Sequence, residues 1–201
     1  MKHIFVSIIS YLFGSINPAY IFGKMKGFDI RERGTGNAGA SNAKICLGWK
    51  YFVICAAFDI SKASMMVLAV RHLLEADELL QIISGCFVII GHCFPFYLNF
   101  KGGKGFAAYI GLILAINWKI FAAITISALI LSLICNYIVF ATLILCIFVP
   151  IVAYISKMSY SCIISLFLIS LLVLFQHRHN FTKFFHGEEI GINGKTIGIK
   201  I

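Results

Sequence analysis

Two glycine-rich, basic segments lie between long apolar stretches of this chain, and their residue types are suited to binding phosphate. The first segment runs from Arg31 to Asn42 and reads RERGTGNAGASN, and the second, Lys101 to Gly105, reads KGGKG. Glycine lets backbone N–H groups converge on an anion, and Lys and Arg supply positive charge beside them. We therefore expect a site for a phosphorylated ligand next to apolar helices.

The first segment combines conformational freedom with side chains that donate and accept hydrogen bonds. Its hydroxyl and amide groups suit substrate oxygens, and its arginines have a fork geometry that matches phosphate. We predict that Thr35 lies at a reacting centre and that substrate is bound by Arg31, Gly34, Gly36, Asn37 and Asn42. The alternative is a flexible loop whose arginines only follow membrane topology.

The second segment lies where one apolar stretch ends and the next begins. A helix that starts just after Gly105 would direct its N-terminal dipole at an anion bound by the loop. We predict substrate-binding roles for Lys101, Gly102, Gly103 and Gly105, and a catalytic role for Lys104. The Walker A pattern is absent, and no acidic residue that could hold magnesium lies nearby, which disfavours ATP hydrolysis.

Five further polar residues are candidates for chemistry or for structure. His92 precedes the second segment and either binds substrate or only bonds a carbonyl at a helix end. His177 and Asn180 follow the last apolar stretch, and an imidazole there suits a general base, although a stop-transfer basic cluster also explains this stretch. Asp59 and Lys62 lie three residues apart within an apolar stretch, so we predict an internal salt bridge.

The composition predicts an integral membrane protein. Hydrophobic residues make up 60% of the chain and charged residues 12%, and the mean hydropathy is +0.94. The 37 residues from Ile120 to Ser156 contain no charged side chain, which is more than the roughly 20 residues that one spanning helix needs. Lipid requires the backbone groups of such segments to bond internally, so we expect helices.

The fold class that follows is an all-α polytopic membrane protein with about seven transmembrane helices in a single membrane domain, 1–201. The expected spans are about 4–23, 45–69, 79–97, 106–118, 120–136, 138–156 and 159–176. The fourth span is short for a membrane helix, so five or six true spans are also compatible with the pattern.

The distribution of positive charge predicts the orientation. With the N-terminus outside, eleven of the 17 Lys and Arg residues fall on the inner side and four on the outer side. This bias follows the positive-inside rule, and it places the C-terminus and the motif loops 24–44, 98–105 and 177–189 in the cytoplasm. The net charge of +9 is then explained by topology and does not indicate nucleic-acid binding.

Two patterns in the chain have little functional weight. The seven cysteines are scattered singly, without a C-x-x-C pair, which supports neither a disulfide framework nor a zinc site. His72 and Asp77 fit the H-x4-D pattern of one large class of acyltransferases, but they fall in an expected outer loop. We therefore treat that match as a coincidence, and we expect no metal or cofactor.

The three polar segments together resemble the bacterial acyl-phosphate-dependent glycerol-3-phosphate acyltransferases. The matching positions are Gly14, Ser15 and Pro18, then Gly27–Asn42, Gly91-His92, Pro95, Phe100, Lys101–Gly105, His177-Arg178, Asn180, Gly187 and Glu189, with Asp59 and Lys62 between them. The motifs follow in order over nearly the whole chain. Two departures are Thr35, where the family has serine, and Ile45, where an arginine is usual and Lys44 is adjacent.

The resemblance implies transfer of a fatty acyl group from acyl phosphate to the sn-1 hydroxyl of glycerol 3-phosphate in the bacterial cell membrane. It implies no need for acyl-CoA, acyl carrier protein or a cofactor, because acyl phosphate is already activated. Thr35, Asn37, Lys104, His177 and Asn180 would surround the reacting centre, and the Lys101–Gly105 loop would bind glycerol 3-phosphate. The base is either His177 or a substrate phosphate oxygen, and Glu189 has a structural role.

Two competing functions remain compatible with parts of the sequence. A transporter of a phosphorylated metabolite would have charges near the membrane midplane and two related halves. Only Asp59 and Lys62 meet the first condition, and no inverted repeat is visible. A CoA-dependent acyltransferase would rest on His72 and Asp77 alone.

Overall fold

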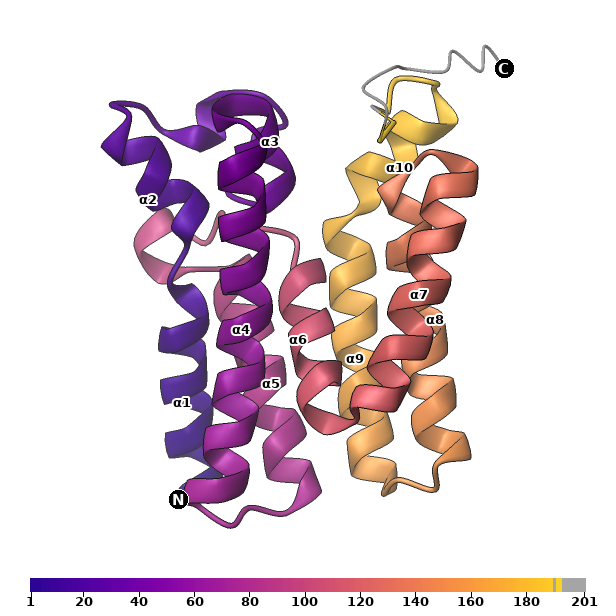
Figure 1. Ribbon diagram of the computed structural model, residues 1–201. Coiled ribbons are helices and arrows are strands. Elements are labelled where there is room, and N and C mark those ends of the chain that lie inside the picture. The colour runs from indigo at the N-terminus through magenta and orange to yellow at the C-terminus, as the bar shows by residue number, and fades with distance from the viewer. Residues whose placement is uncertain (190, 193–201) are drawn as a thin grey trace. The chain divides into compact units, whose positions relative to one another are not determined.

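The computed structural model describes residues 1–189, 191 and 192, and these residues form ten α-helices and two short 3-10 helices (Figure 1). The helices divide into two compact units, Met1–Ile116 and Asn117–Ile201. The expected all-helical membrane architecture is confirmed. The prediction of a single membrane domain stays a prediction.

The first unit contains six α-helices and carries both glycine-rich segments. Its elements are α1 (Lys2–Ser15), α2 (Pro18–Met25), η1 (Ile30–Glu32), α3 (Ala40–Leu47), α4 (Trp49–Leu73), α5 (Glu78–Cys93), η2 (Phe96–Leu98) and α6 (Phe106–Ile116). Within this unit α2 and α3 lie at one end, and the N-terminus lies at the other (Figure 1). Both glycine-rich segments connect to the α2–α3 end through contacts described below.

The first span is broken between α1 and α2. Pro18 has no N–H to continue α1, and the side chain of Asn17 caps α2 by accepting a hydrogen bond from the Tyr20 N–H at 2.9 Å. The carbonyl groups exposed by the break take partners from other segments: the Tyr97 hydroxyl donates to Ser15 O at 2.8 Å, and Lys62 Nζ donates to Ile16 O at 2.9 Å. The break is therefore part of the tertiary structure.

Close helix contacts in this unit occur at glycines, as is common in membrane proteins. A Cβ on Gly111 of α6 would collide with the carbonyl of Ile60 on α4, and the Ser64 hydroxyl of α4 donates to Gly111 O at 2.8 Å. A Cβ on Gly14 of α1 would similarly collide with the backbone of Val88 on α5. The close packing of α6 on α4 and of α1 on α5 thus requires glycine at these two positions.

Gly111→Ala is expected to destabilise the protein by about 1–3 kcal/mol, because the added methyl group must push α6 away from α4. A thiol-reactive dye can follow thermal unfolding in detergent, since five of the seven free cysteines are buried. The control is Ala57→Leu at an exposed position of α4, which should leave the melting temperature unchanged. Equal melting temperatures for the two variants would contradict the close contact.

The second unit contains the remaining helices, α7 (Trp118–Cys135), α8 (Ile138–Ile155), α9 (Tyr160–Gln176) and α10 (Arg178–Phe185). Side-chain caps begin two of them: Asn117 accepts from the first turn of α7, and Ser159 accepts from the Cys162 N–H at the start of α9. Phe184 of α10 packs edge-on against Tyr137 and Phe140 near the start of α8. Aromatic contacts thus hold α10 to this unit.

Five helical segments among the described residues are long and apolar enough to span a membrane: Lys2–Met25, Trp49–Leu73, Glu78–Leu98, Trp118–Cys135 and Ile138–Ile155. The bent pair α9 and α10 is a sixth candidate, with an angle of 49° between its helices. All seven predicted spans are helical, but α6 has only 11 residues. The orientation of the termini stays a prediction.

Two segments that the sequence predicted as loops contain short helices. Residues 24–44 include the start of α3, which Gly48 separates from α4 through its positive φ of 97°. Residues 177–189 include α10. The second span was predicted to begin at about residue 45, which lies in α3, whereas α4 begins four residues later at Trp49.

Candidate active site

The first glycine-rich segment is folded around the buried side chain of Asn42. The Oδ1 atom of Asn42 accepts a hydrogen bond from the Thr35 N–H at 2.7 Å. Its Nδ2 group lies 2.8, 3.1 and 2.8 Å from the carbonyl oxygens of Ile30, Arg33 and Asn37. One amide group thus contacts the backbone of three residues in the segment and of Ile30 just before it. These contacts give Asn42 a structural role, and its predicted contact with substrate stays a prediction.

Asn37 and Thr35 form a small polar group at the surface of the same segment. Asn37 Nδ2 donates to the Thr35 hydroxyl at 2.9 Å, and Asn37 Oδ1 accepts from the Gly39 N–H at 3.0 Å. The backbone turns sharply here, because Gly34 and Gly36 have φ values of 60° and 76°. The Thr35 hydroxyl is therefore held in place by an amide that is itself fixed by a turn.

The Arg31 side chain bonds to Asp29 and to Leu98, and it thereby connects the two glycine-rich segments. Its guanidinium pairs with the carboxylate of Asp29 through contacts of 3.0 and 2.7 Å. Another nitrogen of the guanidinium donates to the carbonyl oxygen of Leu98 at 2.6 Å, just before the second segment. The group also lies over the ring of Tyr20, 5.3 Å from its centroid. Most of its hydrogen-bonding capacity is thus used within the protein.

The hydrogen bonds from Arg31 lower the pKa of the Asp29 carboxyl below its ordinary value. The folded state then favours the carboxylate, so the stabilisation is complete above the ordinary pKa and is lost as the pH falls through the lowered pKa. We expect wild type to melt at a higher temperature than Asp29→Asn at a pH of about 7, and the difference to shrink toward a pH of about 3. Thermal unfolding at both pH values checks this, and a constant difference would contradict it.

The second glycine-rich segment returns along the end of α5 and contacts the first segment. The Gly102 N–H donates to Cys93 O and the Gly103 N–H donates to His92 O, both at 3.0 Å. The Ala38 N–H of the first segment donates to Gly102 O at 3.2 Å. The structure therefore brings the two segments together in one unit, as expected for a common site.

Two glycines of the second segment are needed because other groups approach their backbone closely. A Cβ on Gly102 would collide with the carbonyl of His92 and the ring of Pro95, and a Cβ on Gly103 would collide with the His92 ring. Gly105 has a φ of 88° and begins the turn into α6. These positions allow the loop to lie flat on the end of α5.

The cations of the second segment differ in their exposure. Lys101 is exposed, whereas Lys104 is half-buried and adjacent to the buried Gly103 and Gly105. The first turn of α6 begins at Phe106, so its N-terminal dipole points toward this loop. Lys104 thus lies between the glycine backbone of the loop and the N-terminus of α6, which is a favourable environment for an anion.

The predicted pair of Asp59 and Lys62 is present as a buried salt bridge with an Oδ1–Nζ distance of 2.8 Å. His92 joins it, with its Nδ1 atom 3.0 Å from Lys62 Nζ and 3.2 Å from Asp59 Oδ1. The three side chains are buried, and His92 connects them to the Gly103 backbone. His92 is therefore placed beneath the second segment, with its ring against the glycine backbone.

The remaining predicted residues lie in the second unit, around the junction of α9 and α10. His177 is buried there, and its Nδ1 lies 2.8 Å from the carbonyl oxygen of Val173. A carbonyl only accepts, so Nδ1 carries a proton and Nε2 is the basic nitrogen of the neutral ring. Asn180, one turn further, donates to Glu189 Oε1 at 2.6 Å. Glu189 thus contacts Asn180, and its predicted structural role stays a prediction.

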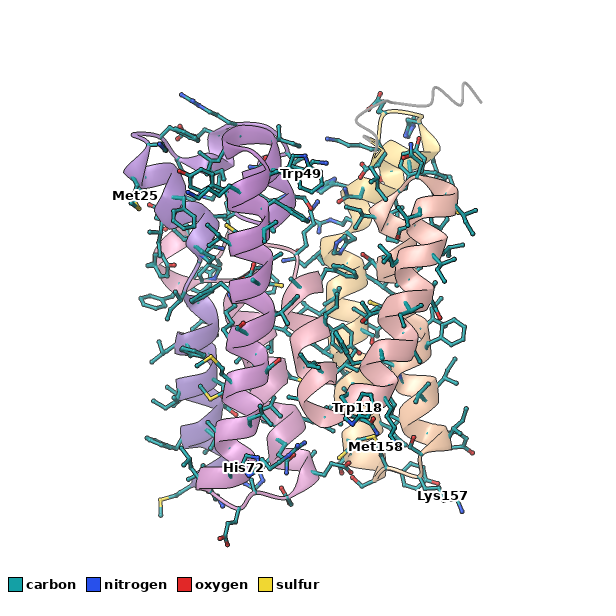
Figure 2. The ribbon with its side chains drawn as sticks, in the orientation of Figure 1. Met25, Trp49, His72, Trp118, Lys157 and Met158 are labelled. Atoms are coloured by element: carbon teal, nitrogen blue, oxygen red, sulfur yellow. The ribbon has the colours of Figure 1, made fainter. Side chains whose placement is uncertain are left out.

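Asp77 has a structural role, and His72 lies at the far end of the first unit from α2 and α3. The Asp77 carboxylate caps α5 by accepting a hydrogen bond from the Leu80 N–H at 2.9 Å. His72 lies in the last turn of α4, at the end of the first unit opposite Trp49 and Met25 (Figure 2). The H-x4-D pattern is therefore far from both glycine-rich segments within this unit.

A comparison of the sequence with models of known protein families identifies the family of this chain. The family model described as glycerol-3-phosphate acyltransferase matches residues 4–187, which is most of the chain. The chain belongs to the glycerol-3-phosphate acyltransferase family. The match includes both glycine-rich segments and the α9–α10 junction, so all three polar regions fall within the family's own sequence pattern.

Curated members of the family are similar over different lengths. The glycerol-3-phosphate acyltransferase 1 of Oceanobacillus iheyensis is 41% identical over 138 residues, which are 65% of this chain and 66% of that protein. The glycerol-3-phosphate acyltransferase of a Thermoanaerobacter species is 34% identical over 201 residues, with 98% of each chain covered. The similarity thus extends over the complete helical architecture.

A solved structure of the family has the same fold. The crystal structure of PlsY, an integral membrane glycerol 3-phosphate acyltransferase, in its glycerol 3-phosphate form has a TM-score of 0.89, 27% identity and 96% coverage of both chains. Its lysophosphatidic acid form has a TM-score of 0.85 and 27% identity, with 95% of both chains covered. These likenesses support the helical assignment of both units of this family member.

Asn17 supports the candidate site and was not predicted from the sequence. Asn17 is buried, and its Nδ2 donates to the carbonyl oxygen of Ala38 in the first glycine-rich segment at 2.8 Å. The same side chain caps α2, so it connects the break in the first span to the site. The signal that could have identified it is the Asn-Pro dipeptide within an apolar stretch, because Asn before Pro favours a helix start.

Proposed function

We propose that this protein transfers a fatty acyl group from acyl phosphate to the sn-1 hydroxyl of glycerol 3-phosphate. The products are 1-acyl-glycerol 3-phosphate (lysophosphatidate) and inorganic phosphate. The relative PlsY has been crystallised in glycerol 3-phosphate and lysophosphatidic acid forms, which correspond to the acceptor and the product of this reaction. The observation that carries the proposal is the hydrogen-bonded pair of glycine-rich segments beside Lys104.

The reaction requires two phosphorylated molecules to be held close together. Their negative charges repel each other, so backbone N–H groups and a lysine beside them lower the energy of the bound state and of the transition state. Holding the hydroxyl near the acyl carbonyl also removes much of the entropic barrier. In the first unit, the half-buried Lys104 supplies positive charge beside the two glycine-rich segments, which are joined by the hydrogen bond from Ala38 to Gly102.

The chemistry needs one bond to form and one to break. The sn-1 oxygen attacks the acyl carbonyl carbon, and the bond from that carbon to the phosphate oxygen breaks with release of phosphate. The hydroxyl proton goes to a base, which is either His177 Nε2 or a phosphate oxygen of a substrate. No metal or cofactor is required for this step, because the mixed anhydride is already reactive.

The placement of the site in the cell is part of the proposal. The excess of Lys and Arg in the segments near the glycine-rich loops favours a cytoplasmic location for them. The enzyme would then lie in the bacterial cell membrane, with the acyl chain of the donor in the apolar region and both phosphates at the cytoplasmic surface. Acyl-CoA and acyl carrier protein are not expected as donors.

The experiment is a turnover assay with the purified protein in a mild membrane mimic. We supply palmitoyl phosphate and glycerol 3-phosphate and measure phosphate release and lysophosphatidate formation. The expected result is release that depends on both substrates, with palmitoyl-CoA unable to replace palmitoyl phosphate. Turnover with palmitoyl-CoA alone would overturn the choice of donor. If neither donor supports turnover in a folded preparation, uptake of glycerol 3-phosphate into vesicles tests the transporter.

A further inference from the structure

The buried cluster of Asp59, Lys62 and His92 has a geometry that a helix-fixing salt bridge alone does not require. It joins α4 to α5 and reaches the break in the first span through Ile16. The exposed fractions of the Asp59, Lys62 and His92 residues are 2%, 1% and 3%. Charged groups at such burial are costly in a membrane protein and usually serve a function.

The hydrogen-bonding capacity of Lys62 determines the protonation of the His92 ring. An ammonium group has three N–H donors and no acceptor. Lys62 Nζ lies 2.8 Å from Asp59 Oδ1, 2.9 Å from Ile16 O and 3.0 Å from His92 Nδ1, which makes one acceptor for each N–H. His92 Nδ1 must therefore present its lone pair, and the proton of the neutral ring lies on Nε2.

The alternative arrangement places the proton on Nδ1, which is 3.2 Å from Asp59 Oδ1. In that case an N–H of Lys62 and the N–H of His92 would face each other at 3.0 Å. The ammonium would lose one of its three acceptors in a buried position, which is unfavourable. The lysine-to-Nδ1 hydrogen bond is thus the better arrangement.

The other edge of the His92 ring faces the second glycine-rich segment. A Cβ on Gly103 would collide with Nε2 and with the two carbons beside it, so this edge lies directly against the Gly103 backbone. The His92 carbonyl also accepts the Gly103 N–H. Within residues 1–189, 191 and 192, no hydrogen bond is made by Nε2, and this atom is not among the fully buried side-chain atoms that lack a partner. An N–H donor at this position, beside the second glycine-rich segment and not sealed by the protein, is available to a ligand.

We infer that Lys62, held by Asp59, is a positioning residue that keeps the imidazole proton of His92 on Nε2. His92 then presents an N–H donor to a phosphate bound at the second glycine-rich segment. This inference deepens the proposed function and rests on it for the identity of the phosphate, which is that of glycerol 3-phosphate. It changes Asp59 and Lys62 from a structural pair into a part of the binding machinery.

The first test measures the His92 tautomer in the resting protein without substrates. Histidine is labelled with ¹⁵N, and the protein is studied in detergent micelles by long-range ¹H–¹⁵N correlation. His92→Gln identifies the His92 signals by their loss. We expect a protonated Nε2 and an unprotonated Nδ1 in wild type, and loss of this preference in Asp59→Asn/Lys62→Met. A protonated Nδ1 in wild type, or an unchanged tautomer in the double variant, overturns the inference.

The double variant is chosen because it removes both charges and leaves no buried charge unpaired. Its thermal unfolding is measured beside Lys50→Met, which removes an exposed charge from the same helix. In the turnover assay the double variant is expected to raise KM for glycerol 3-phosphate about tenfold or more, with KM for palmitoyl phosphate nearly unchanged. Equal changes in both KM values, or none, would assign the cluster to stability alone.

A pair of substitutions at His92 tests which ring nitrogen matters. The amide nitrogen of glutamine reaches the position of Nε2, whereas the amide of asparagine reaches only the region of Nδ1. His92→Gln should therefore retain more affinity for glycerol 3-phosphate than His92→Asn. The reverse order would overturn the inference. Because the tautomer is measured without substrates, absence of turnover in wild type would refute the proposed function and leave the tautomer result to be judged separately.

Discussion

Lys104→Ala is expected to reduce kcat/KM for glycerol 3-phosphate by about 10²–10³-fold, with the protein still folded. Lys104 is half-buried, next to a glycine-rich backbone and to the N-terminus of α6, where negative charge is favoured. Without the ammonium group, the charge of the leaving phosphate and that of the acceptor are no longer balanced. The measurement is the rate of phosphate release from palmitoyl phosphate at varied glycerol 3-phosphate.

The control for this variant is Lys26→Ala, at an exposed position after α2. It removes the same charge from the same unit but not from the second glycine-rich segment, so its kcat/KM should stay within about twofold of wild type, as for surface changes in general. Thermal unfolding of both variants should match wild type. Activity of Lys104→Ala close to that of wild type would remove this lysine from the site.

His177→Gln is expected to lower kcat by about 10²–10⁴-fold, the range for loss of a general base. The Nδ1–H of His177 is used by the Val173 carbonyl, which leaves Nε2 as the nitrogen that accepts a proton. Glutamine places its amide in the region of Nε2 but has no basic nitrogen. The measurement is the pH dependence of kcat, in which the variant should lose the decrease that wild type shows on acidification.

His179→Gln provides a matched control, because His179 is an exposed histidine in the first turn of α10, two residues after His177. Its pH profile should be that of wild type. A loss of less than about fivefold in His177→Gln, with the acidic decrease retained, would assign the proton to a phosphate oxygen of the substrate. His177 would then have a structural role at the α9–α10 junction.

The helical architecture was predictable because the membrane leaves few choices for an apolar chain. The charge-free run from Ile120 to Ser156 corresponds to α7 and α8, which are divided by Asn136 in a left-handed conformation. The break between α1 and α2 was not predicted, because the apolar pattern continues across Asn17 and Pro18. Hydropathy detects a segment that crosses lipid, whereas a break depends on which distant groups satisfy its carbonyls.

The sequence identified the polar residues of the candidate site, but it did not show which other groups of the protein each of them contacts. The glycines and Lys104 followed from local chemistry, since phosphate needs accessible N–H groups and charge. The contacts of Arg31 with Leu98 and of Lys62 with Ile16 join residues 67 and 46 positions apart. Such pairs depend on tertiary structure, so the internal hydrogen bonds of Arg31 and Asn42 could not be predicted from the sequence. Their predicted contacts with substrate stay predictions.

The break in the first span also has a consequence for how this chain can evolve. Asn17 takes the Tyr20 N–H that an unbroken helix would give to Ile16 O, and the ammonium of Lys62 takes its place. A mutation that restores a continuous helix at Asn17 and Pro18 would leave Lys62 one acceptor short in the membrane interior. Conversely, loss of Lys62 would leave a carbonyl without a donor there. We therefore expect these positions to change together among relatives, as a compensated pair.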